Sequence, residues 1–351
     1  MNWDVALILT VGGLATGSVY LLAGLGLVLI FSVTRVVFVP FGDIAAFAAL
    51  SLAAFETGTT PPTIGLVLTL ASLAVVAELW QLMRRRELAR MPRVLMVWGL
   101  LPALPCLAAW WVTGRNLPAI AGIVASILLV VPIAPLIARI ALRPIADASV
   151  LVLLIASLAL HFLLSGLGLL FFGPEGSRTH PLVAGATTLP GGFPVSMQVL
   201  LMIASAIVLS GLFYLLFERT LHGKALRATA INRVGARLVG IRPARTAALA
   251  YGGGSLLAGL IGVLIAPVTT IYYDSGFIIG LKAFVAAIIG GLASYPLTAL
   301  GALAVGLVES FASFWSGALK DVFVFGTLIP VLLLRSLLVS RIEEEEEEID
   351  E

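Results

Sequence analysis

Four ionisable residues stand inside long apolar stretches of this sequence. Asp43 follows a Pro-Phe-Gly break, and His161 is surrounded by Leu and Phe. Glu309 is the only charge between Lys282 and Lys320. A charge in an apolar environment is costly unless it faces water, pairs with another group or serves a passing solute.

Two interpretations stay open for the two acidic residues. Asp43 either takes part in gating and substrate passage or lies at a membrane interface, and Glu309 either pairs within a helix bundle or lines a path. Lys282 is expected to extend to the outer interface, and His161 to have a packing role. The candidate path residues are Gly42, Asp43, Gly290, Gly291 and Glu309, where the glycines let helices approach closely.

Several kinds of chemistry find no support in the sequence. No His, Cys, Asp and Glu residues have the spacing of metal ligands, no Ser-His-Asp context is visible, and no Walker A sequence is present. We therefore expect no catalytic residue, no cofactor and no metal site, so that the chain is not an enzyme. Cys106 is the single cysteine, which excludes an intrachain disulfide. The net charge is only +2, and no nucleic-acid partner is expected.

The longest polar connection, 218–245, has a helical pattern. Leu226, Ala230, Val234 and Leu238 recur at every fourth position and form one apolar face. Gly223 is expected just before this helix and Gly240 near its end. Such a helix either anchors in the lipid interface or docks into a groove on a soluble partner.

The elements that position these residues are membrane spans. The chain is 60% hydrophobic and only 11% charged, with a mean hydropathy of +1.11, far from the composition of soluble domains. We predict an all-α membrane bundle of about 11 spans, because each needs about 20 apolar residues. They lie in 5–34, 41–55, 57–77, 94–114, 116–138, 149–173, 197–217, 246–273, 278–293 and 322–338. One more lies in the part of the apolar run 283–319 that follows the break at Ser294-Tyr295-Pro296. The 41–55 and 278–293 segments are short enough to be half-helices.

The charges predict how the bundle is oriented. With the N-terminus outside, 17 of the 21 Lys and Arg residues fall on the inner side, which includes the 218–245 loop and the C-terminus. The Pro- and Gly-rich segment 174–195 is then an external loop. We expect one transmembrane domain over 1–340 and a disordered acidic tail over 341–351.

Several stretches together resemble the permease subunits of ABC importers for branched-chain amino acids, the leucine/isoleucine/valine type. GKALRATAINRVGARLVGI, within 218–247, is similar to the coupling loop of that family. The resemblance continues, in the family's order, over 14–50, 141–160, 172–176, 193–195 and 281–294. In place of the family's Asn-Phe-Ala-His-Gly-Glu motif the chain has Phe38–Asp43. The region 78–116 looks like an insertion that adds a span.

The resemblance implies a fold, a function and partners. It implies the ABC importer permease fold in the bacterial inner membrane, and the distribution of Lys and Arg predicts a periplasmic N-terminus and a cytoplasmic C-terminus. A separate ATPase would drive inward movement of branched-chain or related amino acids, with a second homologous permease and a periplasmic binding protein as further partners. The residues implied to couple to the ATPase are Gly223, Lys224, Ala225, Leu226, Arg227, Ala228, Asn232, Ala236, Leu238, Gly240 and Ile241.

Two alternatives stay open. A permease of the same fold could carry urea, an amide or a sugar. A secondary carrier would need paired intramembrane charges and often internal repeats, and neither is evident in the sequence. The scarcity of charges in the spans suits a zwitterionic or apolar amino acid better than a strongly charged solute.

Overall fold

The computed structural model describes residues 3–86, 88–115, 118–189, 193–292 and 294–333. Within them, eight helical segments are long and apolar enough to cross a membrane. They are α1 (Trp3–Thr34), α3 (Thr63–Arg85), the Met91–Val112 segment, the Ala119–Ile145 segment, α8 (Val150–Phe172), α9 (Met197–Arg219), α12 (Pro243–Ile265) and α14 (Tyr295–Trp315). The predicted all-helical, polytopic bundle is confirmed.

Two of these spans are composite. The Met91–Val112 segment consists of α4 (Met91–Val94), a π-helical stretch (Leu95–Leu100) and α5 (Leu101–Val112). The Ala119–Ile145 segment consists of α6 (Ala119–Val130), α7 (Ile133–Ile137), a π-helical stretch (Ala138–Leu142) and a final 3-10 turn (Arg143–Ile145). Prolines in these segments remove backbone donors and favour such irregular turns.

The remaining predicted spans are shorter helices. The two expected half-helices are α2 (Phe41–Glu56) and α13 (Gly276–Ile289), which have 16 and 14 residues. The last predicted span, 322–338, begins within α15 (Lys320–Gly326), and its final residues lie outside the described part. Of the 11 predicted spans, α2 and α13 are too short to cross a bilayer by themselves, and the 322–338 span lies partly outside the described residues.

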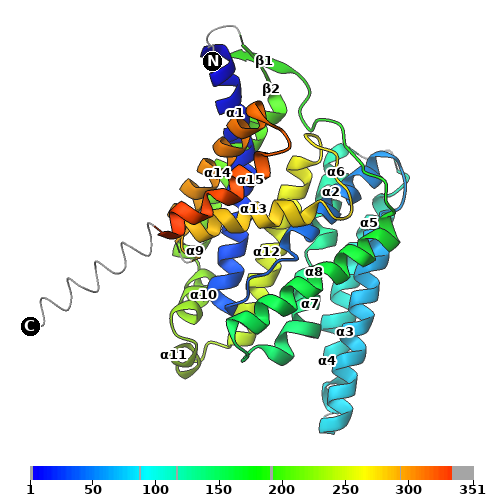
Figure 1. The fold of residues 1–351 in the computed structure, drawn as a ribbon. Helices are drawn as coiled ribbons and strands as arrows, with labels where there is room; N and C mark the ends of the chain where they lie inside the picture. The colour runs from blue at the N-terminus through cyan, green and yellow to red at the C-terminus, as the bar shows by residue number, and fades with distance from the viewer. Residues whose placement is uncertain (1–2, 87, 116–117, 190–192, 293, 334–351) are drawn as a thin grey trace, which may run out of the picture.

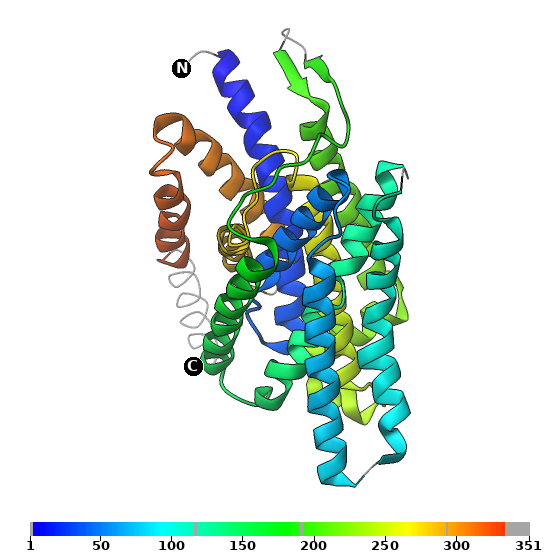
Figure 2. The ribbon, with the colours of Figure 1, turned by 90° about the vertical axis from the view of Figure 1, so that its right-hand side faces the viewer.

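The bundle has two distinct ends (Figure 1). At one, which we call the hairpin end, the start of α1 lies near the antiparallel strands β1 (Ala186–Leu189) and β2 (Phe193–Ser196). At the other, the α10 end, lie the two surface helices α10 (Leu221–Ile231) and α11 (Arg233–Leu238). Figure 2 shows α3 and the segment containing α4 projecting furthest at this second end.

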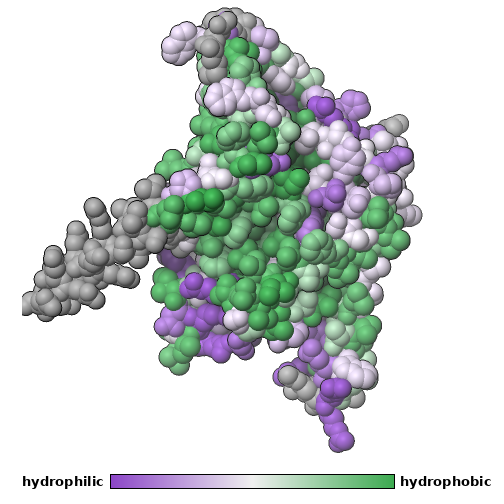
Figure 3. Space-filling model, viewed as in Figure 1, coloured by the Kyte–Doolittle hydropathy of each residue, from purple (hydrophilic) through white to green (hydrophobic). Residues whose placement is uncertain are grey.

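Helices α1 and α14 form the most extensive helix–helix contact among the described elements. A Cβ atom at Gly13 or Gly17 would lie 2.9 Å from the backbone of Leu307 or Leu303, and one at Gly306 would overlap the backbone of α1. In lipid, where apolar burial gives little driving force between helices, such close backbone approach supplies the packing energy. The middle of the bundle surface is apolar, as Figure 3 shows, and its polar patches gather largely toward the ends.

The half-helices α2 and α13 cross inside the bundle at their N-termini. The carbonyl group of Gly276 occupies the space that a side chain at Gly42 would need. From this crossing α2 leads to the hairpin end, where the Glu56 carboxylate accepts a 3.0 Å hydrogen bond from the backbone N–H of His180. Helix α13 leads to the α10 end, where Gly291 lies in the same cavity as Arg227. The predicted path residue Gly42 therefore has a packing reason to be glycine.

Candidate functional site

The single amphipathic helix predicted within 218–245 is two helices, α10 and α11. Asn232 ends α10 and caps α11, because its side-chain oxygen accepts hydrogen bonds from the N–H groups of Val234 (3.0 Å) and Gly235 (2.8 Å). An Asn side chain competes well with the helical backbone at such a position. The chain direction therefore changes at Asn232, and the apolar face does not continue through it.

Of the two glycines expected to flank this helical segment, one lies where it was predicted and the other does not. Gly223 lies inside α10 and not before it. A side chain there would collide with the backbone of Leu216 and Phe217 at the end of α9, which explains the glycine. Gly240 follows α11 with φ +86, a conformation that favours glycine. The expectation for Gly240 is thus confirmed, and the one for Gly223 is corrected.

The break divides the predicted apolar face into a buried and an exposed part. Leu226 packs against Leu29, Val33 and Ala250 of the bundle, and Ala236 is only 3% exposed. Four apolar side chains instead point away from the bundle and form what we call the docking patch: Ile231 (79% exposed), Val234 (67%), Leu238 (84%) and Val239 (75%). Ala236 belongs to the protein's own core and is not available to a partner.

A partly exposed ion pair links α10 to the end of α9. The Arg227 guanidinium donates a hydrogen bond to the Glu218 carboxylate at the end of α9. This hydrogen bond raises the pKa of Arg227. Among the other predicted coupling residues, Lys224 is exposed, while Ala225, Ala228 and Ile241 are half-buried.

The turn between α13 and α14 lies beside α10. Gly291 and Leu292 line a cavity of about 410 Å³ together with Phe31, Arg227 and Tyr295. Gly290 packs against Thr298, whose side chain fills the space of a Cβ atom. These glycines therefore form a tight helical turn beside α10, away from the polar residues inside the bundle.

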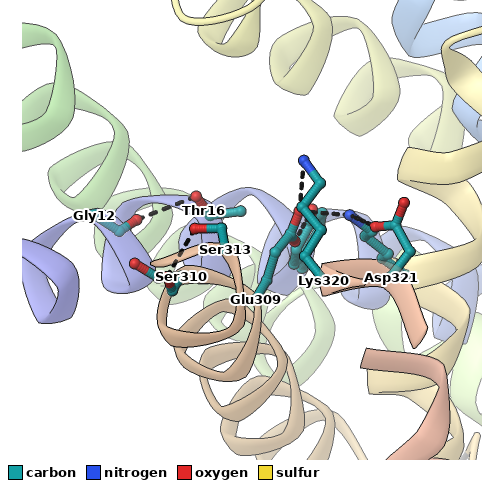
Figure 4. A network of polar contacts seen from close by, with 9 residues as sticks. Gly12, Thr16, Glu309, Ser310, Ser313, Lys320 and Asp321 are labelled. Carbon is teal, nitrogen blue, oxygen red and sulfur yellow. Dashed lines mark hydrogen bonds and ion pairs between the residues drawn. The ribbon is translucent and has the colours of Figure 1, made fainter. Parts of the chain in front are cut away.

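A second polar site lies halfway along the bundle. The Glu309 carboxylate accepts hydrogen bonds from the Tyr20 hydroxyl (2.6 Å) and the Lys282 ammonium (2.5 Å). Lys282 also lies 2.8 Å from the carboxylate of Asp321 in α15, and Lys320 lies 3.9 Å from Glu309. Figure 4 shows how α14 and α15 bring Glu309, Lys320 and Asp321 together. We call Lys282, Glu309, Lys320 and Asp321 the four-charge cluster.

The depth of this cluster corrects the expectation for Lys282. Tyr20 comes 17 residues after the start of α1 and 14 before its end, so that about 25 Å and about 20 Å of helix lie on either side. The Lys282 side chain is 4% exposed and does not reach an interface. Glu309 pairs within the bundle, which is one of the two interpretations given for it. Lys320 (40% exposed) and Asp321 (39% exposed) place the other two charges of the cluster at the surface of the chain.

Asp43 pairs with His161. The Nδ1 atom of His161 lies 2.8 Å and 3.0 Å from the two carboxylate oxygens of Asp43, which is fully buried. Phe277 stacks on the His161 ring with 4.5 Å between ring centroids. Asp43 is therefore buried and paired within the chain, and His161 is a polar partner as well as a packing residue.

The residues of α8 carried a signal that sequence reasoning missed. Its buried residues Leu153, Ser157, His161, Leu164 and Gly168 recur every three or four positions and form one helix face. The Ser157 hydroxyl accepts a hydrogen bond from the backbone N–H of Val39 at 2.9 Å. Ser157 and His161, one turn apart, thus hold the connection between α1 and α2.

Comparison with known proteins identifies relatives over most of the chain. The family described as "Branched-chain amino acid transport system / permease component" matches residues 9–332. The high-affinity branched-chain amino acid transport system permease protein BraD of Pseudomonas aeruginosa is 32% identical over 246 residues, which are 66% of this chain and 78% of BraD.

Two further relatives carry a related name. The permease protein LivH of the same kind of system in Escherichia coli is 32% identical over 209 residues, or 56% of this chain and 66% of LivH. A probable branched-chain amino acid transport permease protein LivH of Methanocaldococcus jannaschii is 27% identical over 216 residues, 58% of this chain and 67% of that protein. The chain thus spans just under two thirds of the Escherichia coli relative. No solved structure matches the chain.

Proposed function

Because this chain belongs to the family of branched-chain amino acid transport permease components, we propose that it forms the membrane subunit of an ABC importer. It moves branched-chain or related amino acids into the cell, and a separate ATPase supplies the energy. Its transmembrane domain covers residues 1–340, in the inner membrane, with the 218–245 segment as the coupling loop. The α10 end faces the cytoplasm, since most of the Lys and Arg residues are assigned to that side.

The docking patch is the observation that carries this proposal. Four large apolar side chains on a surface beyond the spans are an unfavourable feature for a chain acting alone, and they mark a contact site. The patch lies across the α10–α11 break, while the buried Leu226 and the Arg227–Glu218 pair fix this segment to α1 and α9. Movement of a partner protein bound to the docking patch is therefore transmitted to the spans.

The four-charge cluster supports a zwitterionic substrate. Its two ammonium groups and two carboxylates sum to no net charge, and Lys320 and Asp321 present one charge of each sign at the surface of the chain. Charges at this depth need a polar surrounding. A second homologous permease facing them would enclose a polar path, and a periplasmic binding protein would deliver the amino acid at the hairpin end.

A reconstitution experiment tests the proposal. The chain, a homologous permease and the ATPase are placed in proteoliposomes with the binding protein, and uptake of radiolabelled leucine is measured with and without ATP. Val234→Asp places a charge in the docking patch, so we expect loss of ATPase co-purification and at least tenfold slower uptake. Leu221→Asp is the matched control, because Leu221 is also apolar and exposed but lies at the start of α10, away from the docking patch.

The same assay separates the alternatives. The buried Lys282–Glu309 pair is a feature that a secondary carrier would use for ion coupling, and such a carrier would respond to an ion gradient rather than to ATP. A permease for another small solute would take up urea or a sugar in place of leucine. Uptake by the Val234→Asp variant at the wild-type rate would contradict the role of the docking patch.

A further inference from the structure

A basic cavity lies between the ends of three spans at the α10 end. Its volume is about 590 Å³, and it is bounded by α3, by the start of the Met91–Val112 segment and by the last turns of the Ala119–Ile145 segment. We call it the arginine cavity. Its charged lining residues are Glu78, Arg90, Arg93, Arg139 and Arg143.

The charges of this lining do not balance. Arg93, Arg139 and Arg143 share one lining carboxylate, which belongs to Glu78 and is engaged by the Arg139 guanidinium. The Nε atom of Arg139 is buried and has no hydrogen-bond partner among the described residues. A buried guanidinium donor without an acceptor is costly. The cavity is therefore built for an anion with several acceptor oxygens, and a planar guanidinium suits a phosphate group in particular.

The depth of the cavity indicates where this anion comes from. Glu78 lies six residues before the end of one span, Arg139 six before the end of another, and Arg93 two after the start of the third. All three are within two helical turns of the span ends, which is the level of lipid headgroups. Beside the cavity, Trp80, Met83 and Leu95 expose apolar side chains on the outer surface, where lipid acyl chains would lie.

We propose that the arginine cavity binds the phosphate of an anionic phospholipid, such as phosphatidylglycerol, from the leaflet at the α10 end. The headgroup phosphate contacts Arg93, Arg139 and Arg143, and the acyl chains follow the exposed apolar faces of α3 and the neighbouring span. Basic pockets between spans at this level are suited to such headgroups. A free phosphate ion would use the same arginines but would gain nothing from the apolar faces.

Lipid binding to the full-length chain tests this proposal. The protein is purified in detergent, titrated with phosphatidylglycerol, phosphatidylcholine or inorganic phosphate, and followed by native mass spectrometry and by its unfolding temperature. Arg93→Gln should weaken phosphatidylglycerol binding about fivefold and Arg93→Gln/Arg143→Gln about 30-fold, if each arginine contributes about 1 kcal/mol. Arg219→Gln/Arg242→Gln removes two exposed charges at the same end, away from the cavity and from Trp80, and should leave binding unchanged.

The outcomes separate lipid from free anion. Retention of phosphatidylglycerol over phosphatidylcholine, lost in the cavity variants and kept in the control, supports the proposal. Equal retention by wild type and Arg93→Gln overturns it, and the exposed position of Arg93 keeps that variant foldable. Competition by inorganic phosphate at concentrations comparable to those of the lipid also overturns it, because the apolar faces would then contribute nothing.

Discussion

Removal of the Lys282 charge should destabilise the protein strongly. Lys282→Met keeps the length of the side chain but leaves Glu309, only 12% exposed, without its ammonium partner at 2.5 Å. Breaking a buried ion pair from one side costs about 3–5 kcal/mol. Glu309 retains the Tyr20 hydroxyl and has Lys320 at 3.9 Å, so we expect a loss nearer about 2–4 kcal/mol.

The partner substitution should cost less. Glu309→Gln leaves Lys282 with Asp321 at 2.8 Å, and we expect a loss of about 1.5–3 kcal/mol, the range for a hydrogen bond to a charged group. The double variant removes both buried charges together. It should therefore be more stable than the sum of the two single changes predicts, with a coupling of about 1–3 kcal/mol.

Reversible unfolding in mixed micelles at fixed lipid content measures these differences, with leucine uptake as a second readout. If Lys282 extended to an interface, Lys282→Met would change the free energy of unfolding by less than about 0.5 kcal/mol, as surface substitutions do. That result, or simple additivity of the two single changes, would refute the buried cluster.

Two further predictions concern the Asp43–His161 pair and the orientation of the bundle. Asp43→Leu leaves His161 buried without its carboxylate, so leucine uptake should fall while the protein stays in the membrane; normal uptake would show that the pair has no part in transport. After Cys106→Ala, a cysteine at Val183 should react with an impermeant maleimide on intact cells, whereas one at Arg233 should stay unlabelled. The reverse labelling pattern would invert the assigned topology.

The sequence predicted the parts of the fold that depend on composition and spacing. Long uncharged runs gave the spans, and the shortness of 41–55 and 278–293 indicated the half-helices α2 and α13. Helix breaks set by a single side chain were not predicted. Asn232 reads as one polar residue in an amphipathic helix, but its side chain caps α11 and turns the chain.

The polar pairs inside the bundle could not be derived from one sequence. Asp43 and His161 are 118 residues apart, and Lys282 and Glu309 are 27 apart on different helices. Each of these ionisable side chains was recognised as unfavourable in an apolar environment, but the spacing of the residues along the sequence does not identify the partner of each. The first pair follows from the packing of α8 against α2, and the second from the packing of α14 against α13.

The contact between α1 and α14 has a consequence for biosynthesis. Gly13 meets Leu307, so the two partners are made roughly 300 residues apart, and at about 5–20 residues per second α14 is completed about 15–60 s after α1. During this interval the glycine face of α1 lies in the membrane without its final neighbour. The Gly-rich helix α12, which also packs on α1, is synthesised before α14 and can pack against α1 first. Closure of the bundle is thus a late event, and the α1 glycines are where a slowed or truncated synthesis would leave the chain open to wrong helix pairing.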